Sequence, residues 1–112
     1  MIKSLYIKDY AIINELSIDF RPGLTVITGE TGSGKSILLK ALESTLGAKI
    51  NKQMVRSNAE RAVVVSTFSD FELRRIISKK GRSQYYHNDA PISLIKLTSE
   101  IGSLIDFHGQ RD

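Results

Sequence analysis

Apolar and polar residues alternate in two stretches near the start of the chain. Residues 2–9 alternate in part, and residues 16–20, Leu-Ser-Ile-Asp-Phe, alternate strictly. A period of two predicts strands with one buried face and one exposed face. We therefore predict that the chain opens with two strands of a small antiparallel sheet.

A turn, an apolar stretch and an amphipathic stretch follow. Residues 21–23, Arg-Pro-Gly, are a turn signal because proline presets φ and glycine adopts positive φ. Residues 24–28 are mostly apolar and β-branched, which suits a strand buried on both faces of a parallel sheet. From about Lys35 to Leu46, apolar residues recur every three or four positions and predict a helix, with Gly47 placed as its C-terminal cap.

The second half of the chain is dominated by strand patterns. Residues 48–60 are polar and weakly patterned, and we predict a loop with a helical turn there. The predicted strands are 62–68, the two arms of a hairpin at 73–78 and 83–87 around residues 79–82, and 104–107.

Between the hairpin and the last strand, the sequence predicts a turn and a short helix. Residues 88–91 form the turn, and Ser93 caps a helix that ends near Ile101, with Lys96 and Glu100 facing solvent. Residues 85–87, Tyr-Tyr-His, are of the kind that stacks on bases. At alternating strand positions, however, such side chains more often pack against a neighbouring strand, and we favour that interpretation.

Composition places the chain among globular proteins. It has 112 residues, 41% of them apolar and 25% charged, which allows one domain or a piece of a larger one. It has no cysteine, so disulfides and cysteine zinc sites are excluded. We see neither a secretory signal nor a run of about 20 apolar residues that would span a bilayer. We expect a soluble, cytoplasmic protein.

The charge is moderately basic. Sixteen Lys and Arg residues against twelve Asp and Glu give a net charge of +4, which is compatible with an anionic partner. The basic residues are scattered, and no block of five or six like charges occurs. For most of them we favour an ordinary solvated surface and hairpin tips.

The glycine-rich segment carries the chemistry. It matches G-x-x-x-x-G-K-[ST], the phosphate-binding P-loop, and consists of Gly29, Glu30, Thr31, Gly32, Ser33, Gly34, Lys35 and Ser36. Glycines let the backbone curl so that its N–H groups point at phosphate oxygens, and the following helix adds its positive N-terminal end. Lys35 supplies a charge over the β- and γ-phosphates, and Ser36 a hydroxyl for Mg²⁺. The sequence thus predicts a site for a nucleoside triphosphate and Mg²⁺.

An ordered set of motifs resembles the RecN family of bacterial DNA repair proteins. The set comprises residues 7–13, 16–20, 23–36, Met54-Val55-Arg56-Ser57, Glu60-Arg61-Ala62, Gly81-Arg82-Ser83 and 105–110. This resemblance covers essentially the whole chain. The stretch between Phe68 and Leu73 is shorter than the family pattern leads us to expect.

The resemblance implies a fold and a set of site residues. The expected fold class is α/β: the N-terminal lobe of an ABC- or SMC-type P-loop head, with an antiparallel β-subdomain packed on a partial parallel sheet. Residues 1–112 would form the N-terminal half of that head. Gln110 matches the family's Q-loop glutamine, which reaches Mg²⁺ and the γ-phosphate region. Arg56 matches an arginine near the nucleotide or the DNA-facing surface, although a solvated loop charge is equally compatible; for His108 we favour a structural role.

The resemblance also implies what the chain does with its partners. RecN-like heads bind ATP between two subunits, act on DNA in double-strand-break repair, and associate with the nucleoid in the cytoplasm. No Walker B strand and no Leu-Ser-Gly-Gly signature occurs in the sequence, and the coiled coil does not begin. We therefore expect the C-terminal half-head to be a partner, a head-to-head homodimer on ATP binding, and the isolated chain to be inactive.

The sequence is compatible with two other classes of protein. The chain could come from another SMC- or RecF-like chromosome or recombination ATPase with a similar front end. In a different class, it could be a small P-loop kinase or a phosphate-binding module. The sequence does not distinguish single-stranded from double-stranded DNA as a partner.

Overall fold

The computed structural model describes residues 2–20 and 32–101, with the backbone alone for residues 32–36 and Lys52. The strands that we predict at 24–28 and 104–107 lie outside the described residues, and so does the parallel sheet that they were expected to form.

One antiparallel sheet organises the described chain. Its six strands lie in the order β2-β1-β3-β4-β5-β6, and every neighbouring pair is antiparallel. The strands are β1 (Ile2–Tyr10), β2 (Ile13–Asp19), β3 (Arg61–Phe68), β4 (Glu72–Ser78), β5 (Ser83–His87) and β6 (Ala90–Ile92). The predicted antiparallel subdomain is therefore confirmed, although β2 begins three residues before the predicted start.

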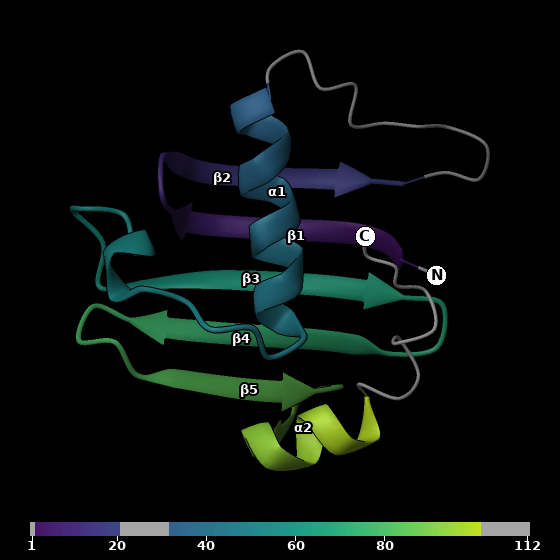
Figure 1. Cartoon of the computed structure of the whole chain (residues 1–112). Coiled ribbons are helices and arrows are strands. Elements are labelled where there is room, and N and C mark those ends of the chain that lie inside the picture. The colour runs from purple at the N-terminus through teal and green to yellow at the C-terminus, as the bar shows by residue number, and fades with distance from the viewer. Residues whose placement is uncertain (1, 21–31, 102–112) are drawn as a thin grey trace.

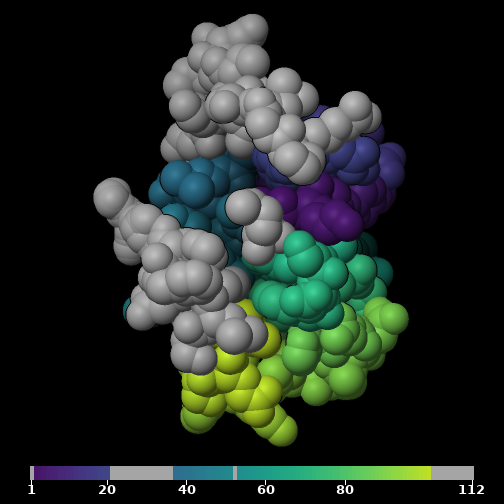
Figure 2. Space-filling view, turned by 90° about the vertical axis from the view of Figure 1, so that its right-hand side faces the viewer, coloured from purple at the N-terminus to yellow at the C-terminus, as the bar shows by residue number. Residues whose placement is uncertain are grey.

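Helix α1 (Gly32–Thr45) covers one face of this sheet. It runs across the strands from β2 toward β4 (Figure 1), so that the helix and the sheet form two layers when seen from the side (Figure 2). Because successive side chains of a strand point to opposite faces of the sheet, every second residue faces α1. The face of the sheet toward α1 is built of fully buried apolar residues, which form the main core with Ala41 of the helix: Leu5, Ile7, Tyr10, Ala62, Val64 and Ile77.

A second, smaller core lies under helix α2 (Leu94–Glu100). Leu97 and Ile101 are buried there against Leu73 of β4. Ser93 caps the helix as predicted, since its Oγ accepts from the Lys96 N–H at 3.1 Å.

The connections largely follow the predicted turn chemistry. The helical turn expected within residues 48–60 is a 3₁₀ turn, η1 (Lys52–Met54). Asn88 and Asp89 both have positive φ, as the mirror-image two-residue hairpin turn requires. The predicted turn at 88–91 was wrong for its last two residues, because Ala90 and Pro91 pair with β5 as the short strand β6. Proline is accepted there because β6 is the last strand in the sheet order and one side of its backbone needs no partner.

The connection between β3 and β4 is tight. The Phe68 N–H donates to the Phe71 carbonyl at 2.7 Å, and the two rings stack with centroids 4.7 Å apart. This is the segment that the sequence marks as short.

Gly47 ends α1 in the left-handed region, with φ of 101°, as predicted for a C-terminal cap. A Cβ at this position would lie 3.1 Å from Leu94 Cδ1 and 3.1 Å from Thr98 Cγ2 of α2.

We predict that Gly47→Ala lowers the free energy of unfolding by about 1–2 kcal/mol, the cost of a left-handed non-glycine residue, with crowding against α2 added. Urea unfolding followed by circular dichroism measures this. Ala48→Ser, at the exposed neighbouring position, is the control, and an equal effect of both changes would contradict the explanation.

Candidate nucleotide-binding site at the start of helix α1

The P-loop meets the fold at the N-terminal end of α1. The helix begins at Gly32, inside the motif and earlier than the predicted Lys35. Backbone amides in the first turn of a helix have no partner within the helix and bind anions. Gly29, Glu30, Thr31 and Gln110 lie outside the described residues, as do the side chains of Ser33, Lys35 and Ser36.

The opposite end of α1 is bound to the sheet by Arg75 of β4. This side chain lies on the covered face of the sheet and is only 4% exposed. Its Nη1 donates to the Ser44 carbonyl in the last turn of the helix at 2.9 Å, and also to the Ala48 carbonyl in the segment after the helix. The Ser44 carbonyl also accepts from the Gly47 N–H at 3.2 Å. One buried guanidinium therefore links the last turn of the helix, and the segment that follows it, to β4.

The rest of the guanidinium is also occupied. Nε donates to Ser83 Oγ at 3.0 Å, and the carbon of the group lies 4.7 Å from the centroid of the Tyr85 ring on β5. Tyr85 is the cross-strand partner of Arg75, so the pairing of β4 with β5 brings the ring to the guanidinium. This confirms the packing role that we favoured for residues 85–87. Tyr86 pairs in the same way with Arg74, at 4.6 Å on the open face.

Burial shifts the acid–base equilibria around this contact. Burial lowers the pKa of Arg75, and the nearby Tyr85 and Tyr10 hydroxyls oppose that shift. Burial also raises the pKa of Tyr10, against a lowering effect of Arg75. Since an arginine guanidinium titrates far above neutrality, Arg75 stays charged and faces the negative end of the helix dipole.

A hydroxyl pair adds a second link between α1 and the sheet. Thr45 Oγ1 lies 2.7 Å from Ser66 Oγ of β3, and both residues are buried. Thr45 Oγ1 also donates to the Leu42 carbonyl at 2.8 Å within the helix. Polar groups in a core stabilise it only when they are paired, and here each hydroxyl has a partner.

Arg56 is held at the other end of the main core. Its Nη1 donates to the Ile12 carbonyl at 2.9 Å, and its backbone N–H donates to the Asp9 carbonyl at 2.9 Å. The side chain therefore stabilises the turn between β1 and β2, where Ala11 has a positive φ of 54°. Because this side-chain bond lies at an exposed position, Arg56 is compatible with the interpretation as a solvated loop charge. Its proximity to nucleotide or DNA stays a prediction. His108 lies outside the described residues.

Beside α1, a cavity of about 310 Å³ opens toward the loop after the helix. Its lining mixes charged, polar and apolar side chains: Tyr10, Lys40, Glu43, Ala48, Lys49, Ile50, Asn51 and Met54.

In the part of the chain that the structure describes, no helix is long and apolar enough to cross a membrane.

The chain that contains this helix and sheet matches a known family over most of its length. The AAA domain family matches residues 4–102. The chain belongs to the AAA domain family. This is an ATPase family, so the P-loop and the helix that follows it belong to an ATP-binding fold.

Sequence relatives of this AAA domain are DNA repair proteins. RecN of Xylella fastidiosa strain 9a5c is 33% identical over 132 residues, covering all of this chain and 24% of the relative. RecN of Bacillus subtilis strain 168 is 36% identical over 134 residues, covering all of this chain and 23% of the relative. The resemblance to RecN drawn from the motifs is confirmed, and the chain spans about a quarter of the length of these relatives. Because both alignments are longer than the 112 residues of this chain, the relatives carry additional residues.

Solved structures give the same fold. An SMC head bound to the C-terminal winged-helix domain of ScpA is similar with a TM-score of 0.80 and 23% identity, over 91% of this chain and 40% of that one. The recombination mediator RecF is similar with a TM-score of 0.74 and 18% identity, over 87% of this chain and 29% of that one. These similarities confirm the predicted fold class, a P-loop head with mixed α/β structure.

Sequence reasoning missed Arg75. In the sequence it is one of several scattered basic residues, between Arg74 and Ile76, and we treated most of these as surface. The signal that was available is alternation, because residues 73, 75 and 77 share the buried face of β4. An arginine at a core position indicates a buried hydrogen-bond acceptor, but the sequence does not show which residue provides it.

We predict that Arg75→Ala lowers the free energy of unfolding by about 3 kcal/mol, because the buried hydrogen bonds to the Ser44 and Ala48 carbonyls and to Ser83 Oγ are lost and a void forms. Urea unfolding monitored by circular dichroism measures the loss. Arg82→Ala, at an exposed position of the neighbouring hairpin, is the control and should change stability by no more than about 0.5 kcal/mol. Equal effects of the two substitutions would show that the buried contacts of Arg75 contribute nothing.

Proposed function

We propose that this chain is the ATP-binding half of a DNA-repair ATPase head, residues 1–112 being the N-terminal half. The observation that carries the proposal is that α1 begins within the P-loop motif and is anchored on a sheet shared with SMC heads. The similarity to RecN, which extends over the whole of this chain, adds the biological context of DNA repair.

In this proposal, ATP and Mg²⁺ are held by the P-loop. The backbone of Gly29–Gly34 surrounds the phosphates, Lys35 neutralises the β- and γ-phosphates, and the hydroxyl of Ser36 binds Mg²⁺. Gln110 supplies an amide oxygen to Mg²⁺ and acts near the γ-phosphate. Lys35 and Gln110 are thus the residues of this chain that we assign to catalysis.

Hydrolysis requires parts that this sequence lacks. A Walker B carboxylate and a signature motif would come from the C-terminal half-head of the same protein. The relatives, about four times as long as this chain, have room for such a half. ATP would then join two heads into a homodimer that acts on DNA, in the cytoplasm and at the nucleoid.

A second candidate is the head of another chromosome or recombination ATPase. The similarity in fold to SMC heads and RecF favours this alternative, but the sequence identity to RecN is higher than to either. The third alternative, a small P-loop kinase, is disfavoured by the family match and by two antiparallel strands preceding the P-loop.

We predict that Lys35→Ala weakens ATP binding about 10- to 100-fold, the loss of one charged hydrogen bond of about 1.5–3 kcal/mol. Binding of a fluorescent ATP analogue in the presence of Mg²⁺ measures the change. Lys40→Ala, an exposed lysine on the same helix, is the matched control and should bind as the unchanged protein does. Unchanged affinity in Lys35→Ala would remove the P-loop from the mechanism.

We further predict that the 112-residue chain alone hydrolyses ATP no faster than its Lys35→Ala variant, because the general base is missing. Phosphate release at saturating Mg-ATP tests this. Turnover that depends on Lys35 in the chain alone would show that no second half is needed.

A further inference from the structure

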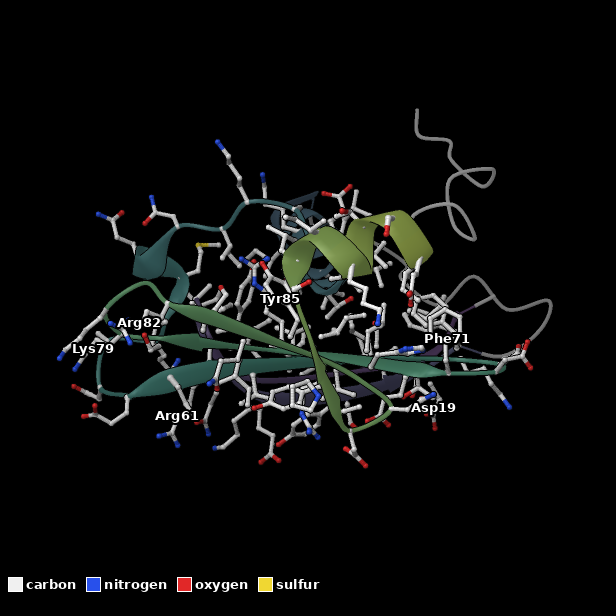
Figure 3. All side chains as sticks on the ribbon, turned by 90° about the horizontal axis from the view of Figure 1, so that it is seen from below. Asp19, Arg61, Phe71, Lys79, Arg82 and Tyr85 are labelled. Carbon is white, nitrogen blue, oxygen red and sulfur yellow. The ribbon has the colours of Figure 1, made fainter. Side chains whose placement is uncertain are left out.

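The basic residues that are scattered in the sequence gather at one end of the sheet. Arg61 opens β3, and its Cα partner across the ladder is Ser78, the last residue of β4. Residues 79–82, Lys-Lys-Gly-Arg, follow as the turn of the β4–β5 hairpin. Strand pairing therefore brings Arg61, Lys79, Lys80 and Arg82 together, and we call these four residues the basic end. Figure 3 shows Arg61, Lys79 and Arg82 at the same end of the sheet, opposite Asp19 and Phe71.

The basic end is exposed and its charges are not neutralised. All four side chains are exposed, and Glu60 is the one acidic residue adjacent to them in the sequence. Within residues 2–20 and 32–101, the ion pairs are Lys8–Asp9, Arg74–Asp89 and Lys96–Glu100, and none includes a residue of the basic end. Like charges gathered at one end of the sheet repel one another unless an anion lies between them.

The backbone of the basic end is held in place. The Lys79 N–H donates to the Glu60 carbonyl at 2.9 Å, which fixes the hairpin to the start of β3. Within the turn, Ser78 N–H donates to the Arg82 carbonyl at 2.8 Å, and Arg82 N–H donates to Ser78 Oγ at 3.1 Å. A turn with a fixed backbone presents its charges at a lower ordering cost than a loose tip would.

The neighbouring tyrosines indicate which anion fits. Single-stranded nucleic acid is bound by stacking its bases on free aromatic rings. Tyr85 and Tyr86, on the strand that leaves the hairpin, have the guanidinium groups of Arg75 and Arg74 over their rings. The basic end itself consists of lysine and arginine side chains without an aromatic residue, which suits the phosphate backbone of a duplex.

We propose that the basic end is a docking surface for the phosphate backbone of double-stranded DNA. This inference rests on the proposed role in DNA repair and adds the surface through which DNA is contacted. The surface is separate from the nucleotide site, because the basic end lies at the β4–β5 hairpin whereas α1 begins over β2 (Figure 1).

The test compares two charge-matched variants of the full-length protein. Lys79→Gln/Lys80→Gln removes two cations from the basic end, and Lys3→Gln/Lys96→Gln removes two exposed cations from β1 and α2. Fluorescence anisotropy with a labelled 30-base-pair duplex, over a range of salt concentrations, measures binding without nucleotide. For the first variant we expect about 10-fold weaker binding and a salt slope smaller by about 2, since each lost phosphate contact removes about one. For the second we expect no more than a twofold change.

Three outcomes would overturn the proposal. The first is an equal loss in both variants, which would reflect net charge alone. The second is no detectable duplex binding by the unchanged protein. The third is tighter binding of poly-glutamate than of duplex with the same dependence on Lys79 and Lys80, which would assign the surface to an acidic protein. Nucleotide binding of each variant is measured in parallel. Normal ATP binding with lost DNA binding in Lys79→Gln/Lys80→Gln separates this proposal from the proposed nucleotide function.

Discussion

The buried guanidinium of Arg75 joins helix α1 to the sheet, since it donates to the Ser44 carbonyl of the helix and to the Ala48 carbonyl just after it. Taking a charge out of water is costly, and burial accordingly lowers the pKa of this group. The cost is offset because its N–H groups donate to two backbone carbonyls and to the Ser83 hydroxyl, and because the guanidinium lies over the Tyr85 ring. This anchor and the apolar packing of α1 against the sheet together hold the helix that follows the P-loop.

The same sheet presents two kinds of cation for two different purposes. On the face covered by α1, Arg75 is enclosed and acts within the protein. At the exposed hairpin, the lysines and arginines of the basic end face water. A phosphate at the helix N-terminus and a phosphate at the basic end would be bound by different physics: oriented backbone amides at the first, and mobile side-chain charges at the second.

The connection between β3 and β4 is short. It is closed by a stacked pair of rings, Phe68 and Phe71, and by the hydrogen bond from the Phe68 N–H to the Phe71 carbonyl. The two central strands thereby stay in register along their whole length, from Arg61–Ser78 to Thr67–Glu72.

Several features followed from the sequence by itself. Alternation predicted β1, β3 and the β4–β5 hairpin, three- and four-residue spacing predicted α1, and local chemistry predicted the caps at Ser93 and Gly47. The P-loop was readable because its glycines, lysine and serine act within one continuous segment. Such features are determined by residues close together in the sequence, and they can therefore be predicted from it.

Only the tertiary structure decided which distant residues meet. Strand β6 depends on a partner strand, and its Pro91 favoured a turn when considered alone. The burial of Arg75 depends on α1 lying above β4, and the hydrogen bond from Arg75 to Ser44 joins residues 31 positions apart in the sequence. The basic end arises because the β3–β4 register places Arg61 beside the hairpin. Pairing across a sheet is set by long-range contacts, and therefore a scattered charge pattern became one surface and one buried anchor.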